Sequence, residues 1–161
     1  RGNQDDPLTN RGWQQMLDTT QNQSWELIAS SPLLRCASFA KHLQSHQQSH
    51  QQSQLEIINN FTELGFGDWQ GLSATEIGQD VVNAFKHDPV RKQPPNAENL
   101  YDFQRRVLNA FNVIIAKKYN STLIVAHAGV IRVIKSHLLN LPIEKMFTIE
   151  VINASCENFE I

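Results

Sequence analysis

The chain has 161 residues, of which 40% are hydrophobic and 19% charged, and its formal net charge is -2. This length suits one domain spanning residues 1–161, large enough to bury a sizeable core. The sequence contains no cationic run and no apolar stretch as long as a membrane span, so we expect neither nucleic acid nor a membrane as a partner.

The N-terminal residues are polar and turn-forming, and the chain begins at Arg1 rather than at a methionine. Thr9 or Asn10 can then cap a helix, because their side chains accept hydrogen bonds from the free amides of a first helical turn. Apolar residues follow at helical spacing, among them Trp13 and Met16. We expect this helix to cover one face of a sheet.

A short strand over residues 25–29 is followed by a second helix. Ser31 suits the N-cap of this helix, and Pro32 suits its first position. Arg35 then falls in the first turn, where the helix dipole opposes a cation, so its presence there needs an explanation. An exposed arginine without a function is the simple alternative.

Residues 42–54 are rich in Gln, Ser and His, with His42, His46 and His50 spaced by four residues. Such spacing can place imidazoles on one helix face and hold a metal ion. The segment has no apolar stripe, and no carboxylate or thiolate accompanies the histidines. We therefore favour a solvated polar segment and expect no metal.

The next strand, residues 55–58, leads into a loop of glycine and aromatic residues over 59–71 that contains Glu63. The glycine spacing matches neither the dinucleotide fingerprint nor a P-loop. Ser73 and Glu76 then form a capping-box pattern, which predicts one helix through Phe85. Residues 87–96 contain three prolines and are interpreted as a loop.

Asn99 can cap the strongest amphipathic helix of the chain, whose apolar face includes Phe103 and Val107. Arg105 and Arg106 are expected elsewhere on the surface of that helix. The two cysteines, Cys36 and Cys156, lie far apart and in no CxxC pattern. This favours free thiols in a reducing compartment, the cytoplasm.

The stretch 123–134 begins with an apolar run that ends at His127 and continues with a helix-period pattern. It predicts a buried strand that delivers His127 to a helix N-terminus. The amides of Ala128 and Gly129 could therefore bind an anion beside the imidazole, with phosphate as the obvious candidate. The alternative is a histidine at a strand end whose hydrogen bonds are all made within the protein and which has no function.

Leu141 and Pro142 end this helix, and residues 149–152 and 156–161 suggest closing strands. Strands and helices alternate through most of the chain, which predicts an α/β fold with a mainly parallel sheet and helices on both faces. Arg35, Glu63 and His127 each follow a strand, so we expect them at the same carboxyl edge of the sheet.

Four segments together resemble the histidine phosphatase (phosphoglycerate mutase-like) superfamily. They are residues 30–36 (Ser-Ser-Pro-Leu-Leu-Arg-Cys), 63–71 (Glu-Leu-Gly-Phe-Gly-Asp-Trp-Gln-Gly), 95–98 (Pro-Asn-Ala-Glu) and 127–132 (His-Ala-Gly-Val-Ile-Arg). Residues 6–12 (Asp-Pro-Leu-Thr-Asn-Arg-Gly) also resemble the segment after the superfamily's first motif. Within the superfamily, residues 66–71 and 95–98 are most similar to α-ribazole-5′-phosphate phosphatases, enzymes of cobalamin nucleotide-loop assembly.

The resemblance implies a three-layer α/β/α sandwich and a phosphomonoesterase that works through a phosphohistidine, without a metal or a cofactor. Arg35 would clamp phosphate oxygens through its forked donors. His127 would donate to a phosphoryl oxygen, assisted by the amides of Ala128 and Gly129. Glu63 would protonate the leaving alkoxide and later activate water.

The same resemblance suggests that Asn3 and Gln4 border the substrate, a small phosphorylated metabolite. The short span between Gly71 and Asn99 favours a phosphatase over a mutase, because a mutase needs a longer lid to exclude water. A homodimer stays open, since nothing in the sequence fixes the oligomeric state.

Two departures from the superfamily pattern are present. Ala128 replaces a glycine, and its methyl group is expected to be tolerated unless the backbone needs a positive φ. The hallmark Arg-His-Gly tripeptide, which supplies the nucleophilic histidine, is absent, and so is the first strand of the fold. We expect this motif just upstream of Arg1, and Arg1 to be a boundary other than the biological start.

Two further functions stay open. One is a broad-specificity sugar or nucleotide phosphatase of the same superfamily. The other is a non-catalytic phosphate-binding remnant, if the chain truly starts at Arg1. A Cys- or Ser-based hydrolase that uses His127 lacks a nucleophile-elbow motif.

Overall fold

The structure is a computed structural model that describes residues 2–46 and 53–161. Its centre is a sheet of three parallel strands, β1 (Leu27–Ser30), β2 (Gln54–Ile57) and β3 (Thr122–Val125). The order is β2-β1-β3, with Ile28 of β1 opposite Leu55 and Leu123. The expected α/β fold with a parallel sheet is confirmed.

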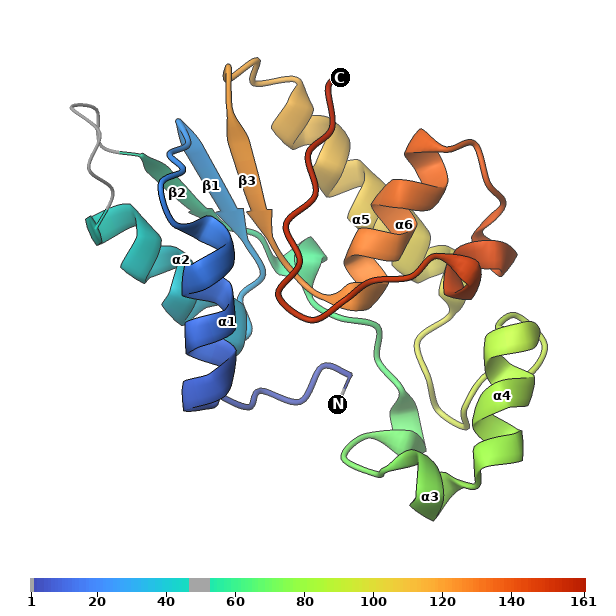
Figure 1. Ribbon diagram of the computed structural model, residues 1–161. Helices are drawn as coiled ribbons and strands as arrows, with labels where there is room; N and C mark the ends of the chain where they lie inside the picture. The colour runs from blue at the N-terminus through green and yellow to red at the C-terminus, as the bar shows by residue number, and fades with distance from the viewer. Residues whose placement is uncertain (1, 47–52) are drawn as a thin grey trace.

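Helices cover both faces of the sheet (Figure 1). On one side lie α1 (Asn10–Thr20) and α2 (Leu34–His46), which pack around Ile28 and Phe39. On the other side lie α5 (Leu100–Ile115) and α6 (Ala128–Leu138), whose buried residues include Phe103 and Val133. The apolar faces of α2, α5 and α6 are thereby buried, and that of α1 is partly buried, which gives the three layers.

The helix caps expected at three positions are present. The Thr9 hydroxyl accepts from the amide of Gly12, and Asn99 accepts from the amides of Tyr101 and Asp102. Ser73 and Glu76 form a reciprocal capping box. These side chains satisfy amides that have no partner inside a first helical turn.

The helix expected from residue 73 through Phe85 is two helices, α3 (Ala74–Ile77) and α4 (Gln79–His87). Gly78 separates them with φ 100°, a conformation outside the helical region that glycine adopts at little steric cost. Three short 3₁₀ helices, η1 (Asn59–Phe61), η2 (Gly67–Trp69) and η3 (Ile143–Thr148), complete the elements of the described residues.

Two further expectations were wrong. The second helix begins at Leu34, not at Pro32, because the Ser31 hydroxyl accepts from the amide of Leu33 in a turn that precedes the helix. Residues 149–152 and 156–161 form no strands, since neither segment pairs with the sheet and a turn with a positive φ at Ala154 lies between them.

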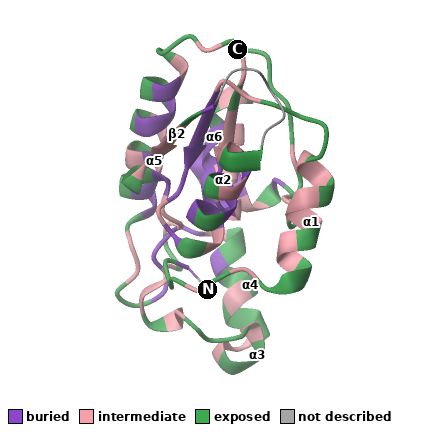
Figure 2. Ribbon diagram, turned by 90° about the vertical axis from the view of Figure 1, so that its left-hand side faces the viewer, coloured by how far each residue is buried: buried purple, intermediate pink, exposed green. Residues whose placement is uncertain are grey.

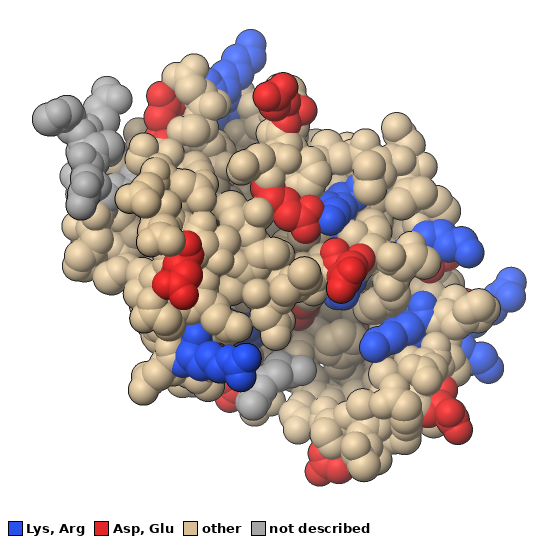
Figure 3. All heavy atoms as spheres, in the orientation of Figure 1, with Lys and Arg blue, Asp and Glu red and all other residues tan. Residues whose placement is uncertain are grey.

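All four residues of β1, the middle strand of the sheet, are buried (Figure 2). On the face drawn in Figure 3, cationic and anionic side chains are interleaved rather than gathered by sign. None of the helices in residues 2–46 and 53–161 has the length and apolar character needed to cross a bilayer.

Candidate active site

Arg35, Glu63 and His127 meet at the carboxyl edge of the sheet, as the strand order requires. Each follows the end of a different parallel strand: Arg35 after β1, Glu63 after β2 and His127 after β3. All three line one groove of 1510 Å³, which continues along β3 toward residues 151–161. Within the described residues β3 is an edge strand, so the groove follows the free side of the sheet.

His127 occupies the N-cap position of α6, where its ring is almost completely buried. Its Nε2 lies 2.7 Å from the hydroxyl oxygen of Ser31, and the thiol sulfur of Cys36 lies 3.7 Å from the same nitrogen. Burial lowers the pKa of His127 to about 3, and the charges of Arg35 and Arg106 act in the same direction. The imidazole is therefore neutral at physiological pH.

The Glu63 carboxylate lies at the N-terminus of α6. Its Oε1 accepts from the amide of Leu64 at 2.9 Å, and its Oε2 accepts from the amide of Gly129 at 3.0 Å. Burial raises the pKa of the Glu63 carboxyl, although both amides and the charges of Arg35 and Arg132 oppose the shift. A carboxyl shifted in this direction can carry a proton closer to neutral pH, as a general acid must.

The Gly129 amide, which the sequence offers as a donor to an anion, donates to Glu63 in this structure. A Cβ atom at Gly129 would collide with Oε1 of Glu63, so only glycine permits this close approach. Ala128 begins α6 and lines the groove, and its φ is not positive, so its methyl group is tolerated as expected.

Arg35 lies in the first turn of α2, and the N-terminal segment explains why a cation is stable there. Its Nη1 donates to the carbonyl of Gln4 at 2.6 Å, and its Nη2 donates to the carbonyl of Gly2 at 2.9 Å. The carboxylate of Asp5 accepts from the Leu34 amide at 2.6 Å and so places a negative charge at the helix N-terminus. These contacts fix the guanidinium and leave further N–H groups on it.

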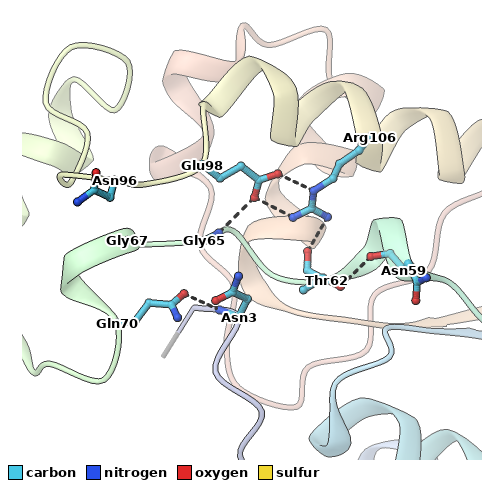
Figure 4. Close-up of a pocket in the computed structure, with 9 residues that line it drawn as sticks. All are labelled: Asn3, Asn59, Thr62, Gly65, Gly67, Gln70, Asn96, Glu98 and Arg106. Atoms are coloured by element: carbon cyan, nitrogen blue, oxygen red, sulfur yellow. Dashed lines mark hydrogen bonds and ion pairs between the residues drawn. The ribbon is translucent and has the colours of Figure 1, made fainter.

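Asn3 and Gln4 lie beside this arginine but face different surroundings. The Gln4 carbonyl holds Arg35, whereas Asn3 lines a separate polar cavity of 520 Å³ (Figure 4). The amide of Asn3 donates to the side chain of Gln70 across that cavity. The other lining residues are Asn59, Thr62, Gly65, Gly67, Asn96, Glu98 and Arg106.

Sequence reasoning missed the roles of Ser31, Glu98 and Arg106. The sequence predicts Ser31 only as a helix cap, yet Ser31 is fully buried and contacts His127. The sequence predicts Arg106 on the surface of its helix, outside the apolar face, yet Arg106 forms a forked ion pair with Glu98. One feature of the sequence indicates partial burial of Arg106. It directly precedes Val107, a buried core residue, and so lies at the border of the apolar face of its helix.

The described residues contain no cluster of three or more histidine, cysteine or acidic side chains able to hold a metal ion. His42 and His46 stack on each other with ring centroids 4.1 Å apart, and His42 also contacts Trp13. His50, the third histidine of the spaced set, lies outside the described residues. The two cysteines are free thiols, as expected.

Comparison with known proteins adds independent findings. The family model for the histidine phosphatase superfamily (branch 1) matches residues 1–161. The chain is 27% identical over 132 residues to a Hydrogenobacter thermophilus protein provisionally named phosphoserine phosphatase 2, covering 80% of this chain. It spans only 63% of the length of that relative.

Two further similarities concern α-ribazole phosphatases. The chain is 28% identical over 153 residues to the adenosylcobalamin/α-ribazole phosphatase of Escherichia coli, covering 90% of this chain and 73% of that protein. The crystal structure of the α-ribazole phosphatase from Shigella flexneri superimposes with a TM-score of 0.73 at 26% identity. That match covers 95% of this chain and 77% of the Shigella chain.

Proposed function

The chain belongs to the histidine phosphatase superfamily, and from this membership and the groove geometry we propose that it hydrolyses phosphomonoesters through a phosphohistidine intermediate. The observation that carries the proposal is the meeting of Arg35, Glu63 and His127 in one groove at the carboxyl edge of a parallel sheet. Ligands of α/β proteins bind at this edge.

Arg35 and His127 are proposed to bind the phosphoryl group. The Arg35 guanidinium, already held by the carbonyls of Gly2 and Gln4, directs its remaining N–H groups to phosphate oxygens. His127 donates a hydrogen bond to a phosphoryl oxygen as negative charge develops on it. A bound phosphate dianion favours the protonated imidazole and so opposes the effect of burial on the His127 pKa.

Glu63 is proposed as the proton donor and acceptor. A histidine nitrogen attacks phosphorus, the ester P–O bond breaks, and protonated Glu63 gives its proton to the departing alkoxide. Water then attacks phosphorus while Glu63 takes one of its protons, the P–N bond breaks, and inorganic phosphate leaves. Release of the Gly129 amide from Glu63 would make this amide available to the phosphoryl group, together with that of Ala128.

The nucleophile of this proposal is the histidine of the Arg-His-Gly motif, a tripeptide that residues 1–161 do not contain. No resident metal or cofactor is required, because Arg35 and His127 supply the stabilising positive charge. Two free thiols and a phosphorylated metabolite as substrate favour the cytoplasm as its location.

The best single substrate candidate is α-ribazole 5′-phosphate. Its support is the similarity to two proteins that are named as phosphatases of that compound. The similarity to a protein provisionally named a phosphoserine phosphatase supports broader phosphomonoesterase specificity as the second candidate.

The test is hydrolysis of a phosphomonoester panel by the full-length protein with its native N-terminus, in the presence of EDTA. The panel contains α-ribazole 5′-phosphate, phosphoserine, sugar phosphates and nucleotides. We expect His127→Ala to lower kcat/KM by about 100-fold or more and Glu63→Gln to do so for alkyl esters by a similar factor. Exposed His137→Ala and Glu150→Gln are the matched controls.

An acid-labile, base-stable phosphoryl label on the enzyme would support the phosphohistidine. Loss of activity in EDTA, or full activity in both site variants, would contradict the mechanism. Phosphate binding without turnover of any ester by the full-length protein would favour the non-catalytic alternative.

A further inference from the structure

Arg106 is the most heavily bonded side chain near the groove, although it does not line the groove itself. It projects from α5, whose neighbouring residues Phe103 and Val107 are fully buried and give it a rigid base. Its Nε and Nη2 form a forked ion pair with Glu98, at 2.6 Å to Oε1 and 2.9 Å to Oε2 (Figure 4). The guanidinium also lies over the Phe103 ring, 4.8 Å from its centroid.

The remaining N–H groups of Arg106 bind the chain that carries Glu63. Nη1 donates to the carbonyls of Asn60 at 2.7 Å and Thr62 at 2.8 Å, and Nη2 donates to the carbonyl of Glu63 at 3.3 Å. Residues 62 and 63 lie outside regular secondary structure. Their backbone path therefore depends on side-chain contacts rather than on a helix or a sheet ladder.

Glu98 holds the same loop on the other side of Glu63. Its Oε2 accepts from the Gly65 amide at 3.2 Å, and its own amide donates to the Gly65 carbonyl at 2.9 Å. The Glu98–Arg106 pair thus fixes the backbone at residues 60, 62, 63 and 65. Both side chains are about three-quarters buried, at 25% and 23% exposure, so solvent competes little for these bonds.

We infer that Arg106, through its fork to Glu98 and its bonds to the carbonyls around Glu63, positions the Glu63 carboxyl for proton transfer to the leaving group. The inference rests on the proposed function, since it concerns the acid of that reaction. Arg106 touches no reacting atom in this arrangement and is a positioning residue. Lysine cannot replace it, because a single ammonium cannot make a planar fork and three carbonyl bonds together.

Substrates with different leaving groups can distinguish a residue that positions the acid from one that only supports the fold. An alkyl phosphate releases a strongly basic alkoxide that needs the proton of Glu63, whereas a nitrophenyl phosphate releases a stable anion that hardly needs it. The parameter kcat/KM covers the steps up to release of the alcohol or phenol, so it reports this proton transfer without the later hydrolysis of the phosphoenzyme.

The experiment compares kcat/KM of the full-length protein and its Arg106→Lys variant on an alkyl phosphate and on p-nitrophenyl phosphate. Arg106→Lys keeps the positive charge that acts on His127, but it cannot make the fork to Glu98 and the three carbonyl bonds together. We expect a loss of about 100-fold on the alkyl ester and less than about 5-fold on the nitrophenyl ester. Arg105→Ala is the matched control, because Arg105 is the neighbouring arginine and is 68% exposed.

Glu98→Gln is the second variant and removes the ion pair from the other side. We expect the same selective loss on the alkyl ester, with an unfolding midpoint that still exceeds the assay temperature. Equal losses on both esters in Arg106→Lys and Glu98→Gln would overturn the inference while leaving the proposed function intact. A wild-type protein inactive on every ester would instead overturn the proposed function.

Discussion

Glu63 and His127 lie at the same end of the sheet, and burial favours the uncharged form of each. The two groups therefore affect stability with opposite pH dependence. The pKa of Glu63 is higher in the folded protein than its ordinary value of 4.5. The stabilisation that Glu63 gives to the folded state is therefore complete below pH 4.5 and is lost as the pH rises through the folded pKa. His127 behaves in the reverse manner.

The stability of the protein is predicted to fall in acid because of His127. Between its ordinary pKa of 6.5 and its folded pKa of about 3, the unfolded chain binds a proton that buried His127 does not bind. Its contribution is therefore complete above pH 6.5 and is lost as the pH falls toward 3. The free energy of unfolding should fall more steeply in the wild type than in His127→Gln, by a difference approaching about 1.4 kcal/mol per pH unit.

Denaturant unfolding of both proteins between about pH 6 and pH 4.5 measures this difference, since other titrating groups act alike in the two. His137→Gln serves as the control, because His137 is exposed. Parallel stability curves for wild type and His127→Gln would show that His127 is not buried in its neutral form.

Gly129→Ala is predicted to damage the site by displacing Glu63. The added Cβ would collide with Oε1 of Glu63 and would lie 3.3 Å from the Phe103 ring, so the carboxylate must move. We expect a free energy of unfolding lower by about 1–3 kcal/mol and a larger loss of kcat/KM on alkyl than on nitrophenyl esters. Ala128→Gly is the control, and activity equal to wild type in Gly129→Ala would contradict the close approach.

At the scale of elements, local chemistry in the sequence decided where several helices begin. Thr9, Ser73 and Asn99 cap their helices as expected, because a cap depends on residues three or fewer positions away. The start of α2 was missed because Ser31 bonds within a turn and to His127, and that partner lies 96 residues away.

Asn99→Ala is predicted to lower stability without altering the chemistry. The side chain of Asn99 satisfies two amides at the start of α5, and their loss should reduce the free energy of unfolding by about 1 kcal/mol. Denaturant unfolding measures the change. The kcat/KM should stay within about 2-fold of wild type, because the buried part of α5 that carries Arg106 is unchanged. Asn109→Ala, an exposed change within the same helix, should not be destabilising.

At the scale of the whole molecule, α3 and α4 project away from the sheet (Figure 1). Aromatic contacts join α4 to the rest of the molecule. The Phe85 ring of α4 packs edge-on against Phe66, Trp69 and Phe147, with centroids 6.0, 5.7 and 5.0 Å away. Phe66 and Trp69 belong to the loop that follows Glu63, so this cluster connects the projecting helices to the site.

Phe85→Ala is predicted to loosen α3 and α4 while the sheet stays intact. Replacing a buried phenylalanine by alanine costs about 3–5 kcal/mol of packing free energy. Phe85 is buried, and the packing lost in this variant is that between α4 and the rest of the molecule. Amide hydrogen exchange of residues 74–87 should accelerate, whereas that of β1, buried in the middle of the sheet, should not. Val81→Ala, half-exposed on α4, is the control, and uniform acceleration would show that the junction supports the whole fold.

The sequence by itself determined the alternation of strands and helices, the parallel sheet, the caps and the placing of Arg35, Glu63 and His127 at one edge. These features follow from apolar periodicity and from short-range hydrogen bonding, which a single chain displays directly. Tertiary structure alone decided the bonds between those residues and their surroundings. The Gly129 amide binds Glu63, Ser31 contacts His127, and Arg106 holds the Glu63 loop with Glu98.

One physical reason separates the features that the sequence determined from those that only the tertiary structure decided. Burial and hydrogen bonding between residues far apart in the chain depend on how the layers pack, and no local pattern encodes that distance. The same reason explains the error at residues 149–152 and 156–161. Their β propensity is a local property, whereas strand formation requires pairing with the sheet, and neither segment pairs with it.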